Sequence, residues 1–181
     1  PMECRGVVAA DDPRTGSITI WSSTQVVHAV RREAAALLGL AEARVRCVAM
    51  TWPVINPLSR YRHAIRLQQG ANPPAWSNGM KEKHDTYWKT EAAMTEGNPT
   101  MILERGEKVV MPPAIWIQGR PDETHDYHDP EGGFPGNEPE RFVSNYRKAG
   151  GEIEITYFDN AKRNTEVSHQ PVYEFLRKHL K

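Results

Sequence analysis

Two loops in the second half of the chain hold the side chains with the clearest chemical potential. The first follows a predicted strand over residues 114–118 and contains Asp122 and Asp126. The second follows a predicted strand over residues 152–158 and contains His169. A carboxylate bonded to an imidazole fixes its tautomer and stabilises its charged form, which is the base-and-orienter half of a nucleophilic triad. This arrangement predicts His169 as a general base, Asp122 as its acid and Asp126 as the fallback acid.

The two loops can meet only if the strands before them are parallel neighbours. After residue 112 the chain alternates strand, loop, helix, strand, loop, helix, with helices expected over residues 139–149 and 171–180. Such alternation is typical of parallel α/β units, whose reactive groups gather at the carboxyl ends of the strands. We therefore expect an α/β fold that brings both loops to one edge of a parallel sheet.

The first 48 residues have a different pattern. Strand-like runs over residues 5–10 and 17–21 flank a turn that contains Asp, Pro and Gly, which predicts a β-hairpin. A helix is expected over residues 25–38, followed by a buried strand over residues 45–50. We treat this hairpin and helix as a separate N-terminal segment.

The remaining region, residues 49–181, begins with an excursion. Residues 52–80 contain several prolines and two tryptophans, and we expect a lid-like, irregular segment with one short helix near residues 59–68. Residues 81–95 and 99–105 are competent to form helices.

Composition limits the classes of function. The chain has 181 residues, of which 39% are hydrophobic and 25% charged, as in an ordinary soluble globular protein. Lys and Arg total 23, as do Asp and Glu, and this balance argues against nucleic-acid and membrane partners. No apolar run approaches the ~20 residues of a membrane helix. The two cysteines, Cys4 and Cys47, form no CxxC motif, so we expect a reducing, cytoplasmic location.

Residues 45–181 resemble the C-terminal part of esterase-like α/β-hydrolases. The resemblance is carried by the turn Ile117-Gln118-Gly119-Arg120-Pro121-Asp122, the segment Trp52-Pro53-Val54-Ile55-Asn56-Pro57, the helix from Glu138 to Gly150 and the loop that contains His169 before Pro171. It implies a partial hydrolase sheet made of the last strands of that fold. It also implies hydrolysis of a small-molecule carboxylic ester or related acyl substrate, with Asp122 as acid and His169 as base.

The nucleophile that this resemblance requires is not visible in the sequence. The elbow Gly-x-Ser-x-Gly is absent, as is an oxyanion-hole motif of the HGGG kind, and Ser59 and Ser168 lack the elbow context. The attacking group would then come from a partner chain or a longer natural product. The alternative is a catalytically incomplete remnant that acts only by association. A short parallel sheet has an exposed edge that the N-terminal hairpin, a second copy in a homodimer or a complementing chain can cover.

Residues 1–48 resemble a short piece of the molybdopterin-binding large subunit of the xanthine dehydrogenase and carbon monoxide dehydrogenase family. The resemblance is carried by residues 1–9 and by the stretch from Trp21 to His28. It implies a further alternative, a fragment of a molybdopterin-dependent oxidoreductase, with Gln25 as a weak candidate for contact with the cofactor. The glycine-rich stretch and later cofactor loops of that family are absent, so we expect no cofactor.

One loop is dense in metal-ligand residue types. Residues 124–129 include His125 and His128, three positions apart. Prolines on both sides and nearby glycines indicate a loop in place of a helix that would align the two rings. We therefore interpret this stretch as a polar loop at the rim of the site and expect no bound metal.

Overall fold

A computed structural model describes the chain at residues 7–12, 14, 17–22, 33–37 and 46–179. The chain divides into two compact units, residues 1–45 and residues 46–181. In the first unit, β1 (Val7–Asp12) and β2 (Ser17–Ser22) pair antiparallel, which confirms the predicted hairpin. Of the helix predicted over residues 25–38, the structure describes residues 33–37, and these are helical. The other residues of that predicted helix lie outside the described ones.

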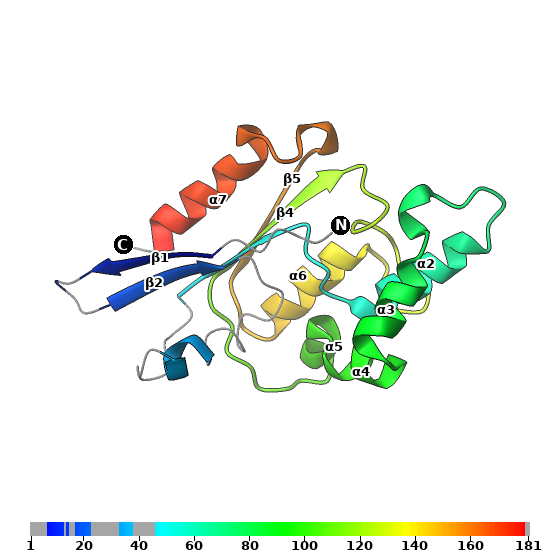
Figure 1. Cartoon of the computed structure of the whole chain (residues 1–181), viewed down its shortest axis with the longest axis horizontal. Helices are drawn as coiled ribbons and strands as arrows, with labels where there is room; N and C mark the ends of the chain where they lie inside the picture. Colours follow the sequence, from blue (N-terminus) through cyan, green and yellow to red (C-terminus); the bar gives the residue numbers. More distant parts are fainter. Residues whose placement is uncertain (1–6, 13, 15–16, 23–32, 38–45, 180–181) are drawn as a thin grey trace. The chain divides into compact units, whose positions relative to one another are not determined.

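The second unit contains a three-stranded parallel sheet in the order β3, β4, β5 (Figure 1). Its strands are β3 (Val48–Thr51), β4 (Ala114–Arg120) and β5 (Ile153–Asp159). In the register of the sheet, Ala114 lies opposite Val48 on one side and Ile153 on the other. The predicted α/β class with a parallel sheet is confirmed.

The central strand β4 is covered on both faces, and all of its residues except Arg120 are buried. Successive side chains of a strand point to opposite faces, so two separate layers pack against it. On one face Trp116 contacts Phe142 of α6 (Glu138–Lys148), with ring centroids 5.6 Å apart. On the other face Ile115 and Ile117 pack with Phe175 of α7 (Glu166–His179). Figure 1 shows α6 and α7 on the two sides of the sheet.

A group of short helices connects β3 to β4 and has a small core of its own, in which Leu58, Tyr61 and Met94 are buried together. Its elements are α2 (Pro57–Gln68), the 3-10 helix η1 (Ala75–Ser77), α3 (Met80–Trp88), α4 (Glu91–Glu96) and α5 (Pro99–Glu104). The predicted helix over residues 81–95 is divided at Lys89, whose φ of 67° lies in the left-handed region and ends α3. No helix in the described parts of the chain has the length and apolarity needed to cross a membrane.

The last helix starts earlier than the sequence predicts. We expected it over residues 171–180, with His169 in the preceding loop, but α7 begins at Glu166 and includes Pro171. The reason is local capping: the Thr165 backbone N–H donates to the Ser168 hydroxyl, which donates to the Thr165 carbonyl. His169 therefore lies in the first turns of a helix. Between β5 and α7 the chain forms the short 3-10 helix η2 (Asn160–Lys162).

Candidate acid–base site

The loop after β4 folds back on itself and brings an acid against a histidine. The backbone N–H of Asp126 donates to the carbonyl of Asp122 over 2.8 Å. The Thr124 N–H donates to Asp122 Oδ1 over 3.1 Å, which forms an Asx turn. This turn returns His125 to Asp122, and His125 Nδ1 lies 2.9 Å from Asp122 Oδ2. A carboxylate and an imidazole are thus paired at the carboxyl end of the central strand.

The pair is almost enclosed by protein, with side-chain exposures of 5% for Asp122 and 10% for His125. Burial by itself raises the pKa of Asp122. Hydrogen bonds from His125, from the Thr124 N–H and from the Gln118 amide outweigh this effect and hold that pKa below its ordinary value. Asp122 is therefore charged at neutral pH.

The structure does not join His169 to either predicted acid. The imidazole of His169 faces Tyr173 on the same helix, with centroids 6.4 Å apart, and it makes no hydrogen bond to Asp122 or Asp126. Asp126 instead accepts from Arg120 Nε over 2.6 Å and from the side chain of Asn137. Of the three residues predicted from sequence, only Asp122 meets an imidazole, and that imidazole belongs to His125.

The two serines considered as attacking groups are engaged elsewhere. The Ser59 hydroxyl lies 3.2 Å from the hydroxyl of Tyr127 and is buried. The Ser168 hydroxyl is fully buried in the cap of α7. Neither serine bonds to His125, so the described residues place no nucleophile on the Asp122–His125 pair.

A small cavity of about 10 Å³ adjoins His125, with room for about one water molecule. In the described part of the chain the hydrogen bonds of the His125 ring involve Nδ1, and Nε2 has no protein partner there. Burial raises the pKa of Tyr127, which therefore stays a hydroxyl donor. Burial is also the largest influence on Glu138 and raises its pKa, although Arg141 and Asn56 donate to its carboxylate. Lining residues of the cavity are Pro53, Val54, Ile55, Asn56, Arg60, Trp116, Thr124, His125, Tyr127 and Glu138.

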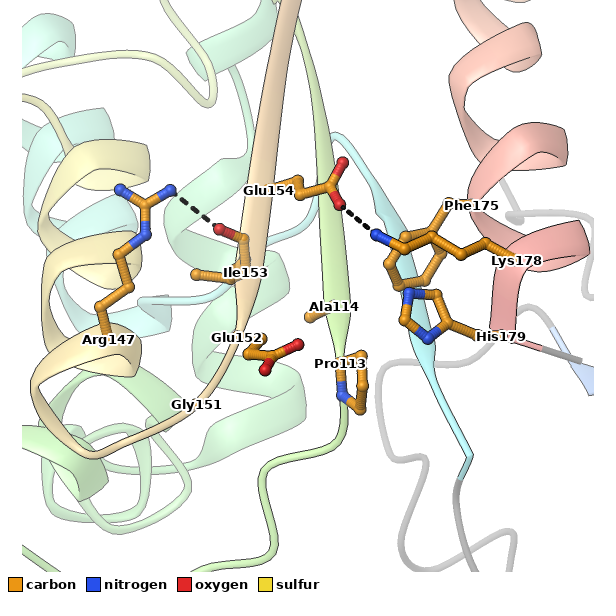
Figure 2. Close-up of a pocket in the computed structure, with 10 residues that line it drawn as sticks. All are labelled: Pro113, Ala114, Arg147, Gly151, Glu152, Ile153, Glu154, Phe175, Lys178 and His179. Carbon is orange, nitrogen blue, oxygen red and sulfur yellow. Dashed lines mark hydrogen bonds and ion pairs between the residues drawn. The ribbon is translucent and has the colours of Figure 1, made fainter.

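A larger cavity of about 330 Å³ lies at the other end of the sheet, where β4 and β5 begin (Figure 2). Its charged side chains are largely occupied by partners. Arg147 Nη2 donates to the Ile153 carbonyl over 2.8 Å, and Lys178 Nζ lies 3.3 Å from Glu154 Oε1. Because reactive groups in parallel sheets collect at the carboxyl ends of strands, we place the candidate site at Asp122 and not here.

Comparisons with known proteins find similarity to a family model and to a solved structure. The family model of the molybdopterin cofactor-binding domain matches residues 1–52. The crystal structure of esterase B from Lactobacillus Rhamnosis (HN001) is similar over 85% of this chain and 47% of that one, with 14% sequence identity and a TM-score of 0.46. The chain therefore spans about half the length of that esterase. None of the curated proteins matches the chain.

Of residues 1–52, which the molybdopterin model matches, the structure describes only part. Gln25 lies outside the described residues. None of the described residues among 1–52 lines either cavity, and the described chain contains no group of three or more His, Cys, Asp or Glu side chains suited to a metal ion. A cofactor of this size needs an enclosing pocket with several placed polar groups.

Sequence reasoning missed the pairing of Asp122 with His125, because it treated His125 only as a metal-ligand type. The available signal was local. An aspartate side chain can accept a hydrogen bond from the backbone N–H two residues later, which favours a tight turn. The side chain three residues after the aspartate is then placed beside its carboxylate.

Proposed function

We propose that this chain carries the acid–base half of an α/β-hydrolase-like site for a carboxylic ester or related acyl substrate. His125 acts as general base and Asp122 orients it. The observation that supports this proposal is the 2.9 Å contact between His125 Nδ1 and the buried Asp122 carboxylate, which leaves Nε2 without a protein partner among the described residues. An imidazole oriented in this way is the group that activates a hydroxyl or a water in acyl transfer.

The chemistry requires one proton to leave and return. His125 Nε2 takes the proton of the attacking O–H group as its oxygen bonds to the acyl carbon. The imidazolium, stabilised by Asp122, then gives the proton to the leaving alkoxide as the original C–O bond breaks. The attacking group is water or a hydroxyl from a completing polypeptide, since Ser59 and Ser168 are engaged elsewhere.

Turnover of p-nitrophenyl acetate by the full chain tests the proposal. We expect His125→Ala and Asp122→Asn each to lower the enzymatic rate by about 10²-fold or more, the usual contribution of a positioned general base. His128→Ala is the matched control, because among the described residues the side chain of this exposed histidine in the same loop bonds to the Gly136 carbonyl and to no part of the Asp122–His125 pair.

A third variant, His169→Ala, separates the structural assignment from the sequence-based one. We expect it to leave the rate unchanged, because His169 contacts neither acid. A loss in His169→Ala with none in His125→Ala would return the base to His169 and refute the assignment to His125. Rates unchanged in all of these variants would refute the hydrolase function itself.

A further inference from the structure

Two buried side chains on one face of β4 lead from the core to the acid–base pair. Trp116 and Gln118 are two positions apart on the strand and therefore point to the same face. Their exposures are 1% and 0%. The Trp116 indole Nε1 donates to Gln118 Oε1 over 3.1 Å, and Gln118 Nε2 donates to Asp122 Oδ2 over 3.2 Å. The hydrogen bonds thus run without interruption from indole to amide, carboxylate and imidazole.

The indole of Trp116 determines which group donates in each of these hydrogen bonds. An indole N–H can only donate, so the oxygen of the Gln118 amide must face Trp116. The same amide nitrogen also donates to the Gly119 carbonyl over 2.9 Å, which requires the same orientation. The NH₂ group of Gln118 therefore points at Asp122, and the amide cannot turn over without breaking two further buried hydrogen bonds.

Asp122 consequently receives N–H donors from more than one side. The Gln118 amide donates to Oδ2 and the Thr124 N–H to Oδ1, so both oxygens of this charged, acceptor-only group are held in place. A group that only accepts can bond to the imidazole only if His125 Nδ1 carries a proton. The other nitrogen, Nε2, is then left as a base when the ring is neutral.

We propose that Gln118 is a positioning residue which, locked by the Trp116 indole, holds the Asp122 carboxylate with Oδ2 toward His125 and so sets the tautomer of that ring, with Nδ1 protonated and Nε2 free. Its importance for catalysis rests on the proposed function, whereas the tautomer itself does not. A tautomer measurement therefore tests the inference whether or not the chain hydrolyses esters.

The experiment is ¹⁵N NMR of histidine-labelled full-length chain at alkaline pH, where imidazole is neutral. The sequence has 7 histidines, and comparison with His125→Ala identifies the signals of interest. We expect the Nδ1–H form of His125 to dominate in the unaltered chain. In Gln118→Met, which keeps the length but loses the amide, we expect the ratio of Nε2–H to Nδ1–H to rise about tenfold, because the carboxylate can then turn away from Nδ1 and one charge-assisted hydrogen bond to the ring is weakened.

Gln170→Met is the matched control, because Gln170 is exposed and its amide donates to Glu174 on the same helix, away from Asp122 and His125 in the described chain; it should leave the His125 signals unchanged. Should Gln118→Met fail to fold, Trp116→Phe removes the indole donor and keeps an aromatic core residue, and it should shift the ratio in the same direction. A His125 ring that is mainly Nε2–H in the unaltered chain, or a ratio unmoved in a folded Gln118 or Trp116 variant, would overturn the inference. If the tautomer behaves as expected and p-nitrophenyl acetate is not hydrolysed, only the proposed function fails.

Discussion

Asp122 and Asp126 lie four residues apart in one loop, and their hydrogen-bond partners give the two carboxylates different roles. Asp126 is held by the guanidinium of Arg120 at 2.6 Å, so its charge is neutralised and its oxygens are occupied. Asp122 accepts only from neutral backbone and amide donors apart from His125, so its charge is directed at the imidazole. This difference makes Asp122, and not Asp126, the acid of the candidate site.

The lowered pKa of Asp122 predicts a measurable effect of pH on stability. A carboxyl whose folded pKa lies below its unfolded value of about 3.8 stabilises the fold above that pH, and this contribution is lost as the pH falls through the folded pKa. We therefore expect the stability difference between the unaltered chain and Asp122→Asn, measured by urea unfolding, to shrink as the pH is lowered below about 3.8.

Asp85, whose side chain is 43% exposed, supplies the comparison for that series. Its partner is Lys81 on the same helix, and water screens the pair, so Asp85→Asn should change stability little at any pH. A gap between the unaltered chain and Asp122→Asn that stays constant across the acidic range would contradict the prediction.

At the scale of elements, buried side chains link three helix starts, of which those at Asn56 and Glu138 line the small cavity. Asn56 caps α2, Asn98 caps α5, and Glu138 opens α6. Asn98 Nδ2 donates to Asn56 Oδ1 over 2.6 Å, and Asn56 Nδ2 donates to Glu138 Oε2 over 2.8 Å. The first turn of a helix carries partial positive charge and unpaired N–H groups. The two asparagine caps and the Glu138 carboxylate supply hydrogen-bond acceptors and negative charge at these buried helix starts.

This convergence predicts that a buried cap matters more than an exposed one. Asn98 is 0% exposed and accepts from the Met101 N–H, so Asn98→Ala removes a cap and a buried side-chain hydrogen bond together. We expect a loss of about 2 kcal/mol in the free energy of unfolding, against ~1 kcal/mol for Thr90→Ala at the exposed start of α4. Equal losses in thermal or urea unfolding would show that the link to Asn56 adds nothing.

At the scale of the whole molecule, the parallel sheet has two edge strands within residues 46–179, β3 and β5. In that region β3 pairs with β4 alone. The backbone N–H groups of Val48 and Trp52 bond toward β4, so those of Ala49 and Thr51 point to the outer side of the strand. An edge of this kind is a template for pairing with another chain, which supports the association role that we considered from sequence.

We therefore predict concentration-dependent association of the chain, measured by sedimentation. Ala49→Pro should reduce it, because proline removes an N–H on the outer side of β3 while the bonds from Val48 and Trp52 to β4 remain. Circular dichroism should show that the variant keeps its secondary structure. A chain that stays monomeric at every concentration, or association unaffected by the substitution, would contradict the role of this edge.

Much of the fold could be predicted from local patterns. The apolar runs of β4 and β5, the glycine pair after α6 and the Asp-Pro turn of the hairpin each act over a few residues, so the α/β class and the parallel order after residue 112 were accessible. Helix boundaries were less accessible. The break at Lys89 depends on one residue in the left-handed region, and the early start of α7 depends on one side-chain cap. The periodicity of hydrophobic residues reveals neither.

The sequence by itself determined which residue types could do chemistry and that they follow parallel strands. It correctly placed Asp122 at the end of a buried strand. Only the tertiary structure decided which histidine this acid meets, because a hydrogen bond requires two groups within about 3 Å and that distance depends on how a turn closes. The turn of the loop brings His125 to Asp122, while the capping of α7 places His169 on a helix beside Tyr173.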